Sequence, residues 1–308
     1  MGPFPNRLSI LIFHRVLPQP DPLFPDLVSA QQFDRQLALL GRWFRVLPLP
    51  EAVRRLRSGT LPARSACITF DDGYADNATV ALPILRARGM HATFFVATGF
   101  LNGGCMWNDA VIEAVRAANA DIDARFLDLG ILPAGSVELK RKAIDALIGV
   151  LKYRPMDERR ECVAELARRC AFTPPADLMM SDAQVRGLRE AGMEIGGHTV
   201  NHPILARLQP EQARHEIREG KRRLEEIAGA AVTLFAYPNG KPRQDYLAEH
   251  VEIVRESGFE AAVSTAWGAA SADADRYQLP RFTPWDRTPT RFLLRLIQNT
   301  LRSQIERV

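Results

Sequence analysis

The chain has 308 residues, of which 46% are hydrophobic and 25% charged, and its formal net charge is +4. This length and composition are typical of a globular protein with a large core, in one barrel-sized domain or two smaller ones. The basic residues are scattered among acids along predicted helices and form no Lys/Arg block, so we expect no nucleic-acid partner.

Short apolar runs alternate with helical patterns along most of the chain, which predicts a parallel βα architecture. Strands are expected at residues 8–13, 44–47, 66–70, 92–97, 193–197, 232–236, 260–265 and 278–282. Helices are expected at residues 29–40, 51–57, 77–88, 181–192, 210–227, 245–257 and 290–302. Seven or eight such units favour an α/β barrel, complete or incomplete, over an open sheet.

One stretch, from about residue 98 to 180, interrupts this alternation. It contains helical patterns near 108–118, 138–152 and 157–170 but no convincing strand. Because the βα alternation resumes directly afterwards, we interpret the stretch as a helical insertion within a single domain spanning residues 1–308.

Two groups of polar residues directly follow predicted strands. Asp71 and Asp72 end one strand, and His198 ends another, with His202 four residues later. In parallel βα folds the carboxyl ends of the strands share one face, so we expect these side chains to meet. Asp72, His198 and His202 would suit Zn²⁺, with Co²⁺, Ni²⁺ or Fe²⁺ as alternatives. Three protein ligands leave a position for water, whose proton Asp71 could accept, which indicates metal-assisted hydrolysis.

Each group is a weak signal by itself. Adjacent acids at a turn often only cap a helix, and a His-x-x-x-His spacing can reflect packing. Pro203 disfavours helical geometry at His202, so a loop is expected there. The occurrence of both groups at strand ends of one chain is what favours a metal site.

Four motifs recur in order and together carry a family resemblance. They are T-F-D-D-G-Y at 69–74, A-T-F-F-V at 92–96, G-G-H-T-V-N-H-P at 196–203 and F-A-Y-P-N-G at 235–240. On these motifs the chain resembles the NodB-type polysaccharide deacetylases, carbohydrate esterase family 4, over roughly residues 8–97 and 181–282. The resemblance implies a deformed (β/α)7–8 barrel that removes acetyl groups from N-acetylated sugars.

The resemblance also implies roles for individual residues. Asp71 would be the general base beside the metal ligands already named. The turn of Tyr237, Pro238 and Asn239 would line the acetyl site and offer a backbone N–H to the tetrahedral oxyanion.

The sequence departs from the family pattern in three places. The third motif often begins with an Arg that orients the base, but Ala236 stands there, and Asn239 replaces the usual Tyr of the turn. The late Leu-x-His motif that supplies a general acid is absent, and Leu279-Pro-Arg281 stands in its place. Arg281 is expected either to orient Asp71 or to form an ordinary salt bridge.

Two further residues are candidates for the site. His14 ends the first predicted strand, and Phe13-His14-Arg15-Val16 resembles the opening of the poly-N-acetylglucosamine deacetylase branch. We expect His14 to border the metal site and protonate the leaving amine or position substrate, although a structural role is the alternative. Trp107, early in the insertion, could stack on a sugar ring or belong to the core.

The leading prediction is a metal-dependent hydrolase acting on an N-acetylated saccharide. The alternatives are a deacylase of another amide, such as a formylated sugar or small cyclic amide, and a non-catalytic saccharide-binding protein. No stretch approaches the length of a membrane span, and the apolar run at 8–13 is shorter than a signal-peptide core. We therefore expect a cytoplasmic protein, or a periplasmic one only if residues have been removed from its amino terminus. The sequence does not predict an oligomeric state.

Overall fold

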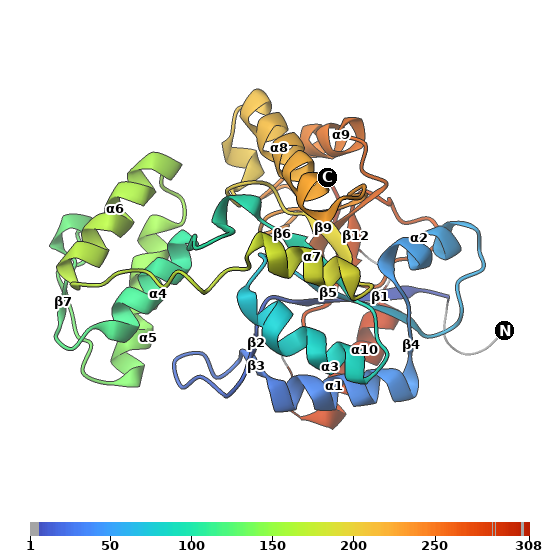
Figure 1. Cartoon of the computed structure of the whole chain (residues 1–308), viewed down its shortest axis with the longest axis horizontal. Helices are drawn as coiled ribbons and strands as arrows, with labels where there is room; N and C mark the ends of the chain where they lie inside the picture. The colour runs from blue at the N-terminus through green and yellow to red at the C-terminus, as the bar shows by residue number, and fades with distance from the viewer. Residues whose placement is uncertain (1–5, 285, 287, 303–304) are drawn as a thin grey trace. The chain divides into compact units, whose positions relative to one another are not determined.

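The computed structural model describes residues 6–284, 286, 288–302 and 305–308. The chain divides into two compact units (Figure 1). The first, called the barrel unit below, consists of Met1–Gln19, Asp26–Leu101 and Met180–Val308. The second, called the helical unit, consists of Pro20–Pro25 and Asn102–Met179.

The barrel unit is built on an eight-stranded parallel sheet. Seven of its strands follow the order β1 (Leu8–Phe13), β5 (Ser65–Phe70), β6 (Thr93–Val96), β9 (Glu194–Gly197), β10 (Leu234–Ala236), β11 (Ala261–Trp267) and β12 (Leu279–Arg281). The remaining strand, β4 (Arg45–Val46), pairs with the first two residues of β5. It lies on the same side of β5 as β6, which pairs with the last two residues of β5. Because all these pairs are parallel, the strands deliver their carboxyl ends to one face.

The two ends of this sheet meet beside β1. Phe282, directly after β12, donates its N–H to Ile10 O at 2.8 Å and accepts the N–H of Ile12 at 3.0 Å. These two hydrogen bonds nearly close the sheet into a barrel. The predicted deformed (β/α) barrel is therefore confirmed.

Apolar runs explain where the strands lie. All six residues of β1 and all six of β5 are buried, as expected for parallel strands covered on both faces. Phe70 stacks on Phe94 with ring centroids 4.8 Å apart, and Phe13 and Phe33 pack against the same group. This aromatic cluster binds the strands to the first helix.

The helices of the barrel unit lie close to their predicted positions. They are α1 (Ala30–Trp43), α2 (Leu49–Arg57), α3 (Leu82–Ala87), α7 (Asp182–Glu190), α8 (Pro210–Ala228), α9 (Ala248–Glu256) and α10 (Pro289–Leu301). The predicted helix at 77–88 differs, because its first turn, η1 (Asn77–Ala81), is π-helical. Two short strands, β2 (Val16–Leu17) and β3 (Val28–Ser29), were not predicted. Among the described helices, none has the length and apolar content needed to cross a bilayer.

The helical unit contains α4 (Trp107–Ala117), α5 (Val137–Leu151) and α6 (Met156–Arg169), close to the predicted patterns. The expectation of no strand is wrong, since β7 (Ile122–Asp123) pairs antiparallel with β8 (Ile131–Leu132). Two-residue strands are too short to show alternation in the sequence. The segment Pro20–Pro25 also belongs to this unit, because Asp21 accepts two hydrogen bonds from Arg116 of α4. Residues 98–101, in contrast, belong to the barrel unit.

Candidate metal and catalytic site

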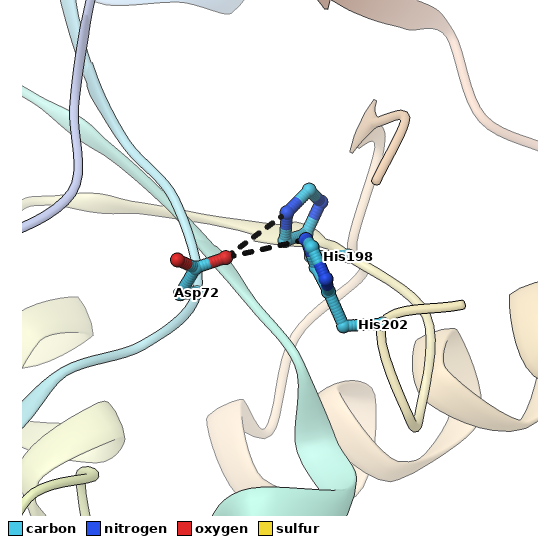
Figure 2. A group of neighbouring side chains, drawn as sticks. All are labelled: Asp72, His198 and His202. Atoms are coloured by element: carbon cyan, nitrogen blue, oxygen red, sulfur yellow. Dashed lines mark ion pairs between the residues drawn. The ribbon is translucent and has the colours of Figure 1, made fainter. Parts of the chain in front are cut away.

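Three side chains that could ligate a metal converge at the carboxyl ends of the strands (Figure 2). The Oδ1 atom of Asp72 lies 3.4 Å from Nε2 of His198 and 3.4 Å from Nε2 of His202. One ligand atom from each residue lies within 4.8 Å of the other two. The structure thus brings together the three predicted ligands.

Strand order explains this convergence. Asp72 follows β5 and His198 follows β9, and only β6 separates these two strands in the sheet. His202 reaches the group because residues 198–203 form a loop rather than a helix, as Pro203 indicated. The two imidazole centroids are therefore only 4.7 Å apart.

The backbone at the site adopts unusual conformations. Asp72, Thr199 and His202 have φ angles of +77°, +67° and +50°, in the left-handed region that L-residues rarely occupy. Such conformations persist only where surrounding contacts hold them, and they concentrate at functional sites. One such contact is the hydrogen bond from His202 N to Thr199 Oγ1 at 3.1 Å.

The donor set fits a divalent ion. His198 places Nδ1 2.7 Å from Ala236 O, so a proton on Nδ1 leaves the Nε2 lone pair free toward Asp72. Asp72 Oδ1 is buried, and no donor of the described residues meets it with hydrogen-bonding geometry. A buried carboxylate oxygen without a partner is unfavourable, and a cation would satisfy it.

Electrostatics also favour the ligand form of Asp72 and His202. For His198, burial lowers the pKa, but the neighbouring carboxylates of Asp72 and Asp71 outweigh burial and raise it. Burial lowers the pKa of His202 to about 4, so its ring is neutral near pH 7. Burial opposes the charge of Asp72, but the neighbouring His198 and His202 outweigh it and hold the pKa of Asp72 below its ordinary value. A carboxylate beside a neutral imidazole is a suitable pair of metal ligands.

Asp71 is fixed beside this group by a buried arginine. Arg281 of β12 donates from Nη1 and Nη2 to the two carboxylate oxygens, each at 2.7 Å. Its Nε donates to Ser264 O at 2.9 Å, and its side chain is fully buried. Oδ2 of Asp71, which accepts from Arg281 Nη2, lies 4.0 Å from His198 Nε2. The structure thus places Arg281 where the sequence predicted a partner for Asp71.

The pKa of Asp71 reflects this arrangement. Burial alone would raise the pKa, but the charges of Arg281 and His198 outweigh burial and keep the pKa below its ordinary value. Asp71 is therefore an oriented, ionised carboxylate at the edge of the ligand group, as a general base must be.

His14 lies at the exposed edge of the site. It follows β1, and its carbonyl oxygen accepts a hydrogen bond from Asn77 Nδ2 at 2.8 Å. Burial raises the pKa of Asp72, and the two imidazoles lower it. The charge of His14 lowers it further. The side chain is thus near the ligands and open to solvent.

The turn after β10 directs the side chain of Tyr237 into the core. The side chain of Tyr237 is fully buried, stacks on Tyr246 at 3.9 Å and donates its hydroxyl hydrogen to Tyr277 O. The side chain of Tyr237 therefore belongs to the core, and the lining of the acetyl site by this turn remains a prediction. The backbone N–H of Tyr237 donates to Val263 O of β11, and Pro238 has no N–H. Among the described residues of this turn, 237–239, only Asn239 therefore has a backbone N–H without a hydrogen-bond acceptor.

Trp107 lies in the helical unit, at the first turn of α4. The guanidinium of Arg159 stacks over its ring, 4.8 Å from the centroid. The ring also packs against the core of the helical unit. Its contact with a sugar remains a prediction.

Sequence patterns did not indicate Glu216, which binds the loop between the two histidines. A signal was present, since this acid lies on the otherwise apolar face of α8 with Ala213, Ile217 and Gly220. An acid on a buried helix face needs a partner, and here the partner is the ligand loop.

Comparison with known proteins identifies the family. Residues 58–152 and 157–262 match the polysaccharide deacetylase family, which is more than half of the chain. The chain therefore belongs to the polysaccharide deacetylase family. The matched segments include Asp71, Asp72, His198 and His202, whereas His14 and Arg281 lie outside them.

Individual relatives are distant. The YxkH protein of Bacillus subtilis, named for the same family, is 22% identical over 90% of this chain and 71% of its own length. The Streptococcus pyogenes deacetylase PplD, solved with acetate, superposes with a TM-score of 0.64 at 22% identity, covering 95% of this chain and 98% of PplD. IcaB from Ammonifex degensii gives 0.61 at 20% identity, covering 96% and 97%. These structures establish the shared fold.

The buried Asp71–Arg281 pair yields a stability prediction. Arg281→Met should lower the free energy of unfolding by about 3–5 kcal/mol, because it leaves a buried carboxylate unpaired. Asp71→Asn combined with Arg281→Met should recover part of this loss, as chemical denaturation of both variants would show. Arg160→Met, which removes an exposed pair with Asp157, is the control and should change nothing measurable. A loss below about 1 kcal/mol for Arg281→Met would contradict the buried pair.

A second prediction concerns Gly220 in α8. An added Cβ there would lie 2.8 Å from the backbone of Thr199, so Gly220→Ala should displace the ligand loop and destabilise the protein. Gly187→Ala in α7 meets no atom within 4 Å and should stabilise the protein by up to about 1 kcal/mol, the helix preference for Ala. Thermal unfolding of both variants tests this contrast, and equal shifts of the same sign would contradict it.

Proposed function

We propose that this chain is a metal-dependent deacetylase that removes an acetyl group from an N-acetylated saccharide. The main supporting observation is the position of Asp71, held by Arg281 and adjacent to Asp72, His198 and His202. Membership of the polysaccharide deacetylase family supports the substrate class. The structural relative PplD was solved with acetate, the product that this reaction would release.

Asp72, His198 and His202 would hold the divalent ion. The nitrogen-rich donor set favours Zn²⁺, with Co²⁺, Ni²⁺ and Fe²⁺ as alternatives. Such an ion, when bound, polarises a carbonyl and lowers the pKa of water to about 7.

Asp71 acts as the general base. Its carboxylate accepts a proton from the water that attacks the acetyl carbon, and such a base contributes about 10²–10⁴-fold in rate. Arg281 holds both carboxylate oxygens, so the direction in which Asp71 accepts the proton is fixed before substrate binds.

Two further groups complete the reaction. The N–H of Asn239 donates to the oxyanion of the tetrahedral intermediate, and such a donor is worth about 3–4 kcal/mol of barrier. When the C–N bond breaks, the leaving nitrogen must gain a proton. His14, exposed at the edge of the site, supplies it, so that acetate and a free amine leave.

The direct test is acetate release from a panel of N-acetylated saccharides, with and without a chelator. We expect release that the chelator abolishes and added Zn²⁺ restores. Metal binding without acetate release from any member of the panel would contradict the proposal. It would instead favour another amide substrate or a non-catalytic saccharide-binding protein.

The general base gives a quantitative prediction. Asp71→Asn should reduce kcat about 10²–10⁴-fold while the metal content of the purified protein is unchanged, because Asp71 is not a ligand. Asp34→Asn, which changes an exposed carboxylate of α1 paired with Arg88, should keep full activity. Loss of the metal in Asp71→Asn would show that Asp71 ligates the ion.

His14 gives a separate prediction. His14→Ala should lower turnover at saturating substrate at least about tenfold, because the leaving nitrogen loses its proton donor. His215→Ala, which changes a histidine on the outer part of α8, is the control. Full turnover in His14→Ala would exclude a role in proton donation.

A further inference from the structure

Helix α8 presents a buried carboxylate to the loop that carries both histidines. Glu216 is only 7% exposed. Its Oε2 accepts the N–H groups of Val200 at 3.0 Å and Asn201 at 2.8 Å, and its Oε1 accepts Asn201 Nδ2 at 2.7 Å. All three donors lie between His198 and His202 in the sequence.

The opposite side of the same loop is bound by the segment after β6. Thr98 N donates to Thr199 O at 3.2 Å, and Gly99 N donates to Val200 O at 2.8 Å. A Cβ on Gly99 would approach Val200 O to 2.8 Å, so only glycine allows this contact. The donors of the loop thus bind α8 and its acceptors bind the segment after β6, which fixes the backbone from two sides.

The geometry of the loop requires such support. Thr199 and His202 both have positive φ angles, and a free loop would relax out of these conformations. Gly220 lies four residues after Glu216 on the same face of α8, and its missing side chain makes room for Thr199. On one face of α8, Gly220 therefore leaves space for the loop and Glu216 binds it.

We propose that Glu216 is a positioning residue for metal binding, which sets the placement of His202 relative to His198 without touching either imidazole. The inference rests on the proposed metal-dependent function. In this inference, α8 stabilises the loop conformation in which the Nε2 atoms of both histidines face Asp72.

The hydrogen-bond pattern allows a nearly isosteric test. In Glu216→Leu the two backbone N–H groups and the Asn201 amide all lose their acceptor. Glu216→Gln is milder, because its carbonyl oxygen can still accept both backbone N–H groups and its NH₂ group can donate to Asn201 Oδ1 once that amide turns over. In Asn201→Asp the exposed partner becomes a carboxylate and faces Oε1 of Glu216. In the double variant the new amide at position 216 can accept both backbone N–H groups through its carbonyl oxygen. Its NH₂ group can then donate to the new carboxylate at position 201, so the pattern is complementary again.

The experiment is a direct titration of the metal-free proteins with Zn²⁺, at a temperature where each variant is folded. Glu216→Leu should weaken Zn²⁺ binding about 10–100-fold, the usual effect of removing a group that orients metal ligands. Asn201→Asp alone should also weaken binding, because two carboxylates then face each other, and Glu216→Gln combined with Asn201→Asp should bind more tightly than Asn201→Asp alone. Glu225→Leu is the matched control, because Glu225 lies on the same helix and accepts the N–H of Val232 before β10, away from the ligand loop.

The outcomes separate the inference from the proposed function. Wild-type Zn²⁺ affinity in Glu216→Leu, or a double variant that binds no more tightly than Asn201→Asp, would overturn the positioning role. Thermal unfolding without metal accompanies the titration, and a loss of stability with unchanged affinity would assign Glu216 a structural role only. Should Glu216→Leu fail to fold, Asn201→Asp tests the same contact from its exposed side. No Zn²⁺ binding by the wild type would instead overturn the metal-dependent function.

Discussion

The buried contact between Arg281 and Asp71 joins the last strand of the barrel to β5 and orients the proposed base. Arg281 lies on β12 and Asp71 follows β5, and both side chains are almost fully shielded from water. A buried charge pair is stable only when its hydrogen bonds are complete. Here the guanidinium binds both carboxylate oxygens and a backbone carbonyl. The same contact therefore pairs two buried charges and holds the Asp71 carboxylate beside the three metal-ligand candidates.

Much of the site follows from local sequence patterns. Apolar runs predicted the strands, and parallel strands must deliver Asp72 and His198 to one face. The Asp71–Arg281 contact was harder to predict, since 210 residues separate the pair and the usual arginine position holds Ala236. The turn motif also did not show that the Tyr237 side chain points inward, where it stacks on Tyr246 and donates to Tyr277 O. These outcomes depend on tertiary packing, which no local pattern encodes.

The ligand loop shows how such a site is stabilised. Positive φ angles at Thr199 and His202 are intrinsically unfavourable, so the loop depends on its neighbours. Those neighbours come from two distant segments, the residues after β6 and the buried face of α8. These neighbours bind the residues between the two histidines, so the sequence motif alone does not contain the site.

The most direct test is a crystal structure of the zinc-loaded protein with anomalous data at the zinc edge. A single peak should lie about 2.0–2.2 Å from the ligand atoms of Asp72, His198 and His202. Asp71 should remain bound to Arg281, outside bonding distance of the ion. A peak elsewhere, or one ligated by Asp71 in place of Asp72, would contradict the assignment of base and ligands.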